Sequence, residues 1–239
     1  TCTAVYLDYE NECNERNVIP ASFVTFCKYI NAQPQYEQTL KRKGKRAAYE
    51  YEEFYWKLEQ DTPRHGERPF HITHIDHTPL DIELVDTVTG KVLGRPWLTM
   101  LIDAFTRKIL AVYLTFESPS KISCMMVLRE CVRRHGRLPQ IIVVDGGKEF
   151  GSVYFEALLA CYEITKKTRP PAESRFGSVI ERLFGTAHTQ FIYNLIGNTQ
   201  ITKNVRQVTK ANNPKNRAIW TLPRLFNRLC EWAYEIYDK

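Results

Sequence analysis

The run IIVVD at residues 141–145 constrains the fold of this chain more than any other sequence feature. Four consecutive apolar residues are typical of a short strand buried on both faces, as in a sheet covered by helices. The run ends in Asp145, and Gly146 and Gly147 follow it without side chains that would block a close approach of another backbone. We therefore expect a central strand that delivers a carboxylate at its carboxyl end.

The segments on either side of this run alternate between strand and helix patterns. Three strand-like regions come first, then a helix, the central strand, a helix, a short strand and a further helix. This order predicts an α/β fold, a mixed sheet flanked by helices. The segments are the strand regions 71–76 continuing into 81–86, 97–103, 108–116, 141–145 and 163–167, and the helices 120–135, 152–162 and 178–194.

The first 70 residues have a helical pattern instead. Phe23, Cys27 and Ile30 recur at helical spacing, and residues 5–13 supply a partner helix. Two short helices joined in this way are compatible with a helix-turn-helix-like domain in which residues 21–31 read a DNA groove. A plain small helical bundle is the alternative interpretation.

Residues 61–69 collect proline, glycine and charged residues, which is typical of a boundary between domains. We accordingly divide the chain into a helical DNA-binding domain with its linker, residues 1–62, and an α/β domain, residues 63–239.

Composition excludes several classes of protein. Apolar residues make up 44% of the chain, enough for a packed core and too many for wholesale disorder. No run approaches the roughly 18 apolar residues of a membrane span. The seven cysteines are scattered without a CxxC pair, which favours reduced thiols and a cytoplasmic protein. The chain begins at Thr1 without a signal-peptide pattern, so we expect it to be part of a longer intracellular polypeptide.

The basic residues are concentrated in one stretch. Residues 166–228 contain twelve Lys and Arg but only two acids, Glu173 and Glu181. Such a stretch predicts a polyanion surface, most simply nucleic acid, and a solvated basic face is the alternative. The candidate phosphate contacts are Lys148, Lys166, Lys167, Arg169, Arg175, Arg182 and, in the amino-terminal run KRKGKR, Lys41, Arg42 and Lys43.

Three acids are candidates for catalysis. Asp76 ends the first strand run, Asp145 ends the apolar strand, and Glu181 lies near the start of a helix in the basic stretch. Phosphodiester chemistry by two divalent ions needs several carboxylates that converge from rigid elements. We expect these three side chains to meet and bind two Mg²⁺ ions, which Mn²⁺ can replace.

Other residues offer alternatives for the site. Glu149 or Glu173 could replace one of the three ligands, whereas Asp81, Asp86 and Asp103 fit turns or sheet edges. Three histidines, His71, His74 and His77, raise a zinc hypothesis, which the lack of a nearby CxxC pair disfavours.

The sequence around the acids resembles a known family. Thirty-five residues separate Asp145 from Glu181, and Asp76 precedes them in HIDHTPLD. Together with GRPWLTMLIDAFTRKILAVYLTFESPS, VVDGGKEFGS, KKTRPPAESRFGSVIERLFGTAHTQF and LIGNT, these contexts resemble the TnsB/TniA-type, Mu-like DDE transposases of the retroviral integrase superfamily. The resemblance covers roughly residues 71–200.

This resemblance implies an RNase H-like fold and a DNA transposase that cleaves the 3′ ends of a transposon and joins them to target DNA. Asp76, Asp145 and Glu181 would be the metal-binding triad, and Gly185, one turn beyond Glu181, would leave room for a DNA strand. Implied partners are transposon-end and target DNA, further copies of the chain on paired ends, and an AAA+ ATPase that selects targets, with CRISPR-guided targeting in some systems. Such an enzyme would act in the bacterial cytoplasm at the nucleoid.

Two other functions remain open from the residues. A nuclease of the same fold would share the acids and cut without joining. A non-catalytic DNA-binding protein would retain only the scaffold.

Overall fold

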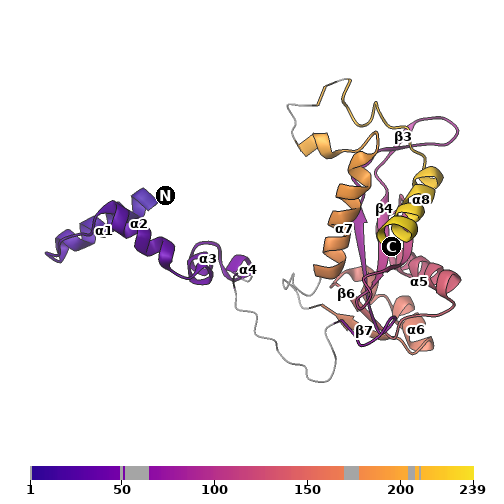
Figure 1. The fold of residues 1–239 in the computed structure, drawn as a ribbon, viewed down its shortest axis with the longest axis horizontal. Helices are drawn as coiled ribbons and strands as arrows, with labels where there is room; N and C mark the ends of the chain where they lie inside the picture. Colours follow the sequence, from indigo (N-terminus) through magenta and orange to yellow (C-terminus); the bar gives the residue numbers. More distant parts are fainter. Residues whose placement is uncertain (1, 49–50, 52–64, 170–177, 204–207, 210) are drawn as a thin grey trace. The chain divides into compact units, whose positions relative to one another are not determined.

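The chain divides into two compact units, residues 1–58 and 59–239 (Figure 1). The computed structural model describes residues 2–48, 51, 65–169, 178–203, 208–209 and 211–239.

The first unit is helical, as predicted. Its helices are α1 (Cys2–Glu15), α2 (Phe23–Ala32), α3 (Gln35–Lys43) and α4 (Lys45–Ala48). Ser22 caps α2 by accepting a hydrogen bond from the amide of Thr25. Gly44, with φ +80°, ends α3 in a backbone conformation that favours glycine.

Aromatic contacts hold α1 against α2. The ring of Tyr6 lies 5.1 Å from that of Phe23 and 5.3 Å from that of Phe26, and Tyr9 stacks on Phe26 at 5.1 Å. Both tyrosine hydroxyls also bind the backbone of Ala21, at 2.8 and 3.0 Å. The connection between the two helices is therefore fixed at the residue that precedes the α2 cap.

The second unit contains a five-stranded mixed sheet in the order β5-β4-β1-β6-β7. Strands β1, β4 and β5 are antiparallel neighbours, and β6 and β7 run parallel to β1. This arrangement confirms the expected RNase H-like α/β fold. The strands are β1 (Ile72–Pro79), β4 (Trp97–Asp103), β5 (Ile109–Thr115), β6 (Ile141–Val144) and β7 (Thr165–Thr168).

Helices cover both faces of this sheet because its strands alternate apolar side chains between the two faces. On one face Met100 and its alternate neighbours on β4 pack against α7 (Ser178–Gln190) and α8 (Leu222–Glu231). On the other face Leu101, Ile142 and Val144 pack against α5 (Lys121–His135) and α6 (Val153–Cys161). Within β6, Ile142 and Val144 are buried in this core, whereas Ile141 and Val143 on the other face are only partly buried. The prediction of a strand buried on both faces is therefore met on one face only.

Side-chain caps start the two helices of the second face. Ser120 accepts from the amide of Ile122 at the start of α5, and Ser152 accepts from that of Phe155 at the start of α6. Gly136, with φ +67°, ends α5.

The region after β1 differs from its predicted form. Residues 81–86 were expected to form a full strand, but only β2 (Leu84–Val85) is extended, paired with β3 (Val92–Gly94) in a separate hairpin. Strand β1 itself continues to Pro79, so Asp76 lies within the strand instead of at its end. The pairing of β1 with β6 ends at His74, whereas residues Asp76 to Pro79 are still paired with β4.

The carboxyl-terminal segment was not predicted, although LPRLFNRLCE has the spacing of an amphipathic helix. It forms α8 and the π-helical turn η7 (Trp232–Tyr237), and it covers the edge strand β5. The amide of Val112 donates to the hydroxyl of Tyr234 at 3.1 Å, and the amide of Ile109 donates to Asp238 at 2.9 Å.

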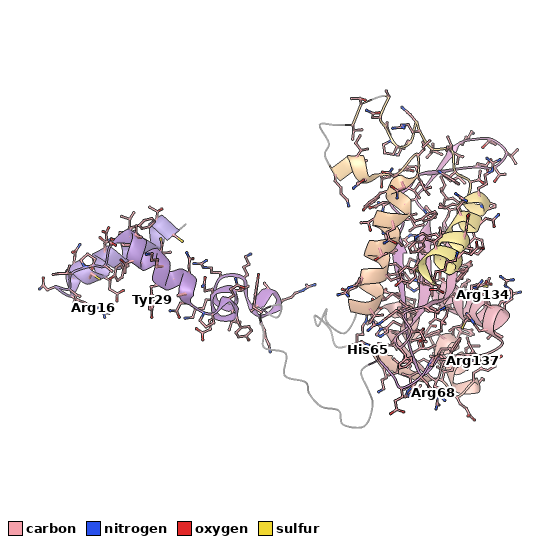
Figure 2. All side chains as sticks on the ribbon, viewed as in Figure 1. Arg16, Tyr29, His65, Arg68, Arg134 and Arg137 are labelled. Carbon is pink, nitrogen blue, oxygen red and sulfur yellow. The ribbon has the colours of Figure 1, made fainter. Side chains whose placement is uncertain are left out.

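Two cation–aromatic contacts fix the end of α5. The guanidinium of Arg134 lies 3.3 Å from the ring centre of Tyr234, and that of Arg137 lies 3.9 Å from the ring centre of Phe70. Both arginines are labelled in Figure 2. The first of these contacts joins α5 to the carboxyl-terminal segment.

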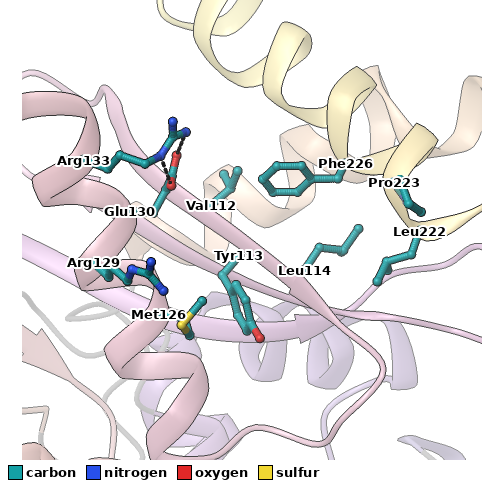
Figure 3. A pocket seen from close by; sticks show the side chains of 10 residues that line it. All are labelled: Val112, Tyr113, Leu114, Met126, Arg129, Glu130, Arg133, Leu222, Pro223 and Phe226. Atoms are coloured by element: carbon teal, nitrogen blue, oxygen red, sulfur yellow. Dashed lines mark hydrogen bonds and ion pairs between the residues drawn. The ribbon is translucent and has the colours of Figure 1, made fainter.

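An apolar hollow of about 380 Å³ remains between α5, β5 and α8. Phe226 and Leu222 of α8 face Val112 and Leu114 of β5 across it (Figure 3). Among the described residues, no helix is both long enough and apolar enough to cross a lipid bilayer.

The packing of α8 predicts the effect of a core truncation. Leu229 is fully buried against the sheet, so Leu229→Ala should lower the free energy of unfolding by about 2–5 kcal/mol. Urea denaturation measures this. Ile236→Ala is the matched control, because Ile236 is 61% exposed. Equal effects of the two substitutions would contradict the assigned packing.

Candidate active site

Strand register brings Asp76 and Asp145 into one row across the sheet. His74 of β1 lies opposite Val143 of the parallel strand β6. Two residues further along each of these two segments are Asp76 and Asp145. Asp145 lies just past the end of β6, and its carboxylate acts electrostatically on that of Asp76. The next strand adds Arg169, whose amide donates to the carbonyl of Val144 at 2.8 Å.

The alternation of side chains places Asp76 on one face. Ile75 and Val144 belong to the core beneath α5 and α6. Asp76, the neighbour of Ile75, therefore points to the opposite face, which α7 covers. Asp145 directly follows the last residue of β6, and its carboxylate acts electrostatically on both Asp76 and His77. Helix α7 carries Glu181 in its first turn. The fold thus brings Asp76 and Glu181 to the same side of the sheet, with Asp145 at the end of the neighbouring strand β6.

Arg169 connects two of these acids. Its guanidinium donates a 2.9 Å hydrogen bond to the Oδ2 atom of Asp76, and its other terminal nitrogen lies 3.7 Å from Oε1 of Glu181. The side chains of Arg169 and Asp76 are 10% and 17% exposed, whereas that of Glu181 is 52% exposed. A largely buried cation therefore bridges a largely buried carboxylate and a more exposed one.

The environment of Asp76 shifts its titration. Burial raises the pKa of Asp76, and the nearby carboxylate of Asp145 raises it further. The 2.8 Å hydrogen bond from the amide of His77 and the charge of Arg169 act in the opposite direction on this pKa. Two like charges held this close favour a cation between them.

The backbone after β6 fixes Asp145. Its Oδ1 atom accepts a 2.9 Å hydrogen bond from the amide of Gly147. The 3₁₀ turn η2 (Lys148–Gly151) follows, and its Phe150 is buried under the sheet. Asp145 is therefore held between a rigid strand and an anchored turn.

His77 attaches this turn to the sheet. Its ring stacks on Phe150 at 5.2 Å and hydrogen-bonds the hydroxyl of Thr99 on β4 at 2.7 Å. Its other ring nitrogen lies 3.7 Å from the sulfur of Cys124 on α5. Burial lowers the pKa of His77, so the ring is neutral at neutral pH.

The predicted phosphate contacts have different surroundings. Lys166 points to the face opposite the acids, where it pairs with Glu156 and donates to the carbonyl of Phe150 at 3.0 Å. Binding a phosphate would require it to leave that pair. Arg182 is exposed on α7, and Lys167 is partly buried on β7.

The remaining predicted contacts are distributed over both units. Lys41, Arg42 and Lys43 form the exposed last turn of α3. Arg175 and the alternative ligand Glu173 lie outside the described residues, as does the side chain of Lys148. Arg169 was expected to contact DNA, and its contact with two carboxylates was not foreseen. A lone arginine in a basic stretch carries no sequence signal for that role.

The alternative acids have other partners. Asp86 and Asp103 each close a turn by accepting from Thr89 and Thr106, respectively, as their sequence contexts suggested. Asp81 pairs with Arg95 at 2.6 Å. The carboxylate of Glu149 lies against Gly147 and acts electrostatically on His77, on the face away from α7.

Within the described part of the chain, no three His, Cys, Asp or Glu side chains are close enough to form a ready metal centre. The guanidinium of Arg169 lies between Asp76 and Glu181. Among the histidines of the zinc hypothesis, His71 accepts from the amide of Glu67 and His77 contacts Thr99.

Comparison with known proteins identifies relatives of this chain. The family model described as the TnsB C-terminal domain matches residues 74–197. The transposase for transposon Tn552 of Staphylococcus aureus is 26% identical over 195 residues, which cover 78% of this chain and 39% of that protein. The Tn7 transposition protein TnsB of Escherichia coli is 29% identical over 136 residues, covering 49% of this chain and 19% of that protein.

The chain thus spans less than half the length of these two relatives. Among solved structures, a chain of the simian T-cell lymphotropic virus intasome in complex with PP2A regulatory subunit B56 gamma matches with a TM-score of 0.46 and 18% identity, over 73% of this chain and 53% of that one. The HTLV-2 integrase catalytic core in complex with magnesium, trimeric form, matches with a TM-score of 0.38 and 20% identity, over 64% of this chain and 84% of that one.

The buried ion pair predicts a stability change. Arg169→Ala leaves the buried Asp76 carboxylate without its cation and should lower the free energy of unfolding of the metal-free protein by about 3 kcal/mol. Chemical denaturation measures this. The matched control is Arg133→Ala, because Arg133 is exposed in its pair with Glu130 and little change is expected. A loss no larger than the control's would mean that Asp76 and Arg169 are not a buried pair.

The raised pKa of Asp76 predicts a pH dependence. A carboxyl whose pKa is higher in the folded than in the unfolded state opposes folding once it ionises, so its cost grows as pH rises above 3.8, its ordinary pKa. The variant Asp76→Asn lacks this ionisable group. The difference between its free energy of unfolding and that of the unsubstituted protein should therefore increase as the pH rises from about 4 toward neutrality. Metal-free denaturation at a series of pH values measures this trend.

Asp86→Asn is the control, because its effect on the free energy of unfolding should change with pH in the opposite direction. Hydrogen bonds from Thr89 and Val88 lower the pKa of Asp86, so this acid stabilises the fold above its ordinary pKa of 3.8 and loses that contribution as pH falls. Parallel trends in the two variants would contradict the assigned environments.

Proposed function

Because the chain belongs to the TnsB C-terminal domain family, we propose that it is the catalytic part of a DNA transposase that cleaves the 3′ ends of a transposon and joins them to target DNA. The α/β unit, residues 63–239, would carry out the chemistry. Residues 1–62 would bind transposon-end DNA. The observation that supports the proposal most is that Asp145 directly follows the strand paired with the Asp76 strand, while Arg169 links Asp76 to Glu181 of α7.

Asp76, Asp145 and Glu181 would hold two Mg²⁺ ions, with Mn²⁺ as a substitute. Carboxylate oxygens on rigid elements are the donors that Mg²⁺ prefers. The effect of Asp145 on the pKa of Asp76 and the bridging Arg169 both support a site that attracts cations. Divalent ions there would stabilise charge on the reacting phosphate and on the oxygens that attack and leave it.

The protein side chains have separate tasks in this proposal. Asp76 and Asp145 supply fixed oxygens from adjacent strands, whereas the more exposed Glu181 can turn toward them from α7. Arg169 must release the carboxylates when divalent ions bind, which frees its guanidinium for a phosphate oxygen of the DNA.

We extend the proposal to partners. The substrates are double-stranded transposon-end and target DNA, bound by several copies of the chain on paired ends in the bacterial cytoplasm. An AAA+ ATPase would select the target. These partners rest on family membership and on the basic residues 166–228.

A strand-transfer assay tests this function. Protein, a pre-nicked transposon-end duplex, target plasmid and Mg²⁺ should yield joined strands. Asp145→Asn should reduce joining about a thousandfold, because several kcal/mol of transition-state stabilisation are lost. DNA affinity should be retained.

Asp86→Asn is the control, because this acid closes a turn in the β2–β3 hairpin, and it should join normally. Cut products without joined products would favour the nuclease alternative. Undiminished joining by Asp145→Asn would overturn the catalytic assignment.

A further inference from the structure

An open cleft of about 480 Å³, lined mainly by polar residues, lies between the end of β1 and the middle of α7. Thr78 and Pro79 of β1 form one wall, and Gly185, His188 and Thr189 of α7 form another. The remaining lining residues are Asp81, Arg95, Tyr193 and Lys203.

The cleft continues the catalytic row along two elements. Glu181, Gly185 and Thr189 are spaced by four residues, so they form one stripe on α7, and Gly185 is about 6 Å beyond Glu181 along the helix axis. Thr78 follows Asp76 by two residues on the same side of β1, or about 7 Å. A DNA strand advances about 3.4 Å per nucleotide. The cleft is therefore about two nucleotides from the acids.

Gly185 is the most informative residue of this cleft. Glycine in a helix interior is less favourable than alanine, yet a Cβ atom at Gly185 would meet nothing within 4 Å. Packing within the described chain therefore does not require glycine there. A bare patch of helix beside a polar cleft fits the close approach of an external molecule.

The charges in the cleft favour an anion. Arg95 and Lys203 are cations, and Asp81 is the one acid among the lining residues. Arg95 is held rigidly, because it donates to the carbonyl of Leu80 at 2.8 Å and to Asp81 at 2.6 Å. Its position does not depend on a ligand.

Lys203 is the more available cation. It donates to the hydroxyl of Tyr193 at 3.0 Å and lies 3.9 Å from the carboxylate of Asp81. Its side chain is 63% exposed, and its ammonium has three donors in all. His188 carries its proton on Nδ1, which donates to the carbonyl of Phe184 at 2.9 Å, while Nε2 accepts from the amide of Asp81. The two cations Arg95 and Lys203 and the one acid Asp81 leave the lining with one surplus positive charge.

We propose that this cleft is a phosphate subsite, in which Lys203 and Arg95 bind a backbone phosphate about two nucleotides from the scissile bond while Gly185 lets the strand lie against α7. This inference deepens the proposed function and rests on it. The ligand class is the sugar–phosphate backbone of DNA, and the contact is independent of base sequence.

The first test looks for opposite effects of one substitution on thermal stability and on DNA affinity. Gly185→Ala should raise the unfolding midpoint of the protein by about 2–4 °C, because alanine favours the helix. The same methyl group should weaken binding of a random-sequence duplex about tenfold, as an added group in a close contact does. Thr186→Ala is the matched control, because Thr186 is on the same helix and does not line the cleft. It should leave DNA affinity unchanged.

The second test counts phosphate contacts. In metal-free buffer, Lys203→Gln should reduce the slope of log K against log salt concentration by about 0.9, the value of one phosphate contact. Lys108→Gln is the control, because Lys108 precedes β5 at the opposite end of β4 from the cleft. It should leave the slope unchanged.

The outcomes separate the two proposals. A protein that joins DNA but shows unchanged affinity in Gly185→Ala and an unchanged salt slope in Lys203→Gln would overturn the subsite and leave the proposed function intact. A protein that neither joins nor binds DNA would overturn the proposed function itself. Stabilisation of Gly185→Ala together with weaker DNA binding and a reduced Lys203→Gln slope supports the subsite.

Discussion

The parallel pairing of β1 with β6 is the constraint on which the candidate site depends. A shift of one residue would move Asp145 out of step with Asp76 and turn the side chains of β6 to the opposite faces. The apolar residues of β6 prevent that shift, because Ile142 and Val144 are fully buried on the α5 face. Core packing therefore holds the two carboxylates together, although neither contributes an apolar contact.

This constraint explains why much of the site was predictable from sequence. IIVVD predicted a buried strand ending in an acid, and the observed strand ends at Val144 with Asp145 next. The strands containing Met100 and Val112 and the helices following Ser120 and Ser152 were also predicted, because their periodicity and capping residues are local signals.

The features that sequence did not predict depend on contacts between distant residues. The position of Arg169 follows from a third strand aligned with β6 and from two acids, one of them 93 residues away. The role of Asp81 requires Arg95, Tyr193 and Lys203 to converge from separate turns. Helix α8 is a different case, because the spacing of its apolar residues is visible in the sequence. Only the element it packs against, strand β5, could not be read from the sequence.

The contacts of Tyr234 and Asp238 with β5 have a consequence for assembly. An outer strand exposes backbone amides that can template a further strand from another molecule, which is a common route to aggregation. Here the hydroxyl of Tyr234 and the carboxylate of Asp238 each accept a hydrogen bond from one of those amides. The segment that contains Tyr234 and Asp238 therefore blocks part of the free edge of β5. Two copies of the protein at high concentration are hindered from pairing through this edge strand.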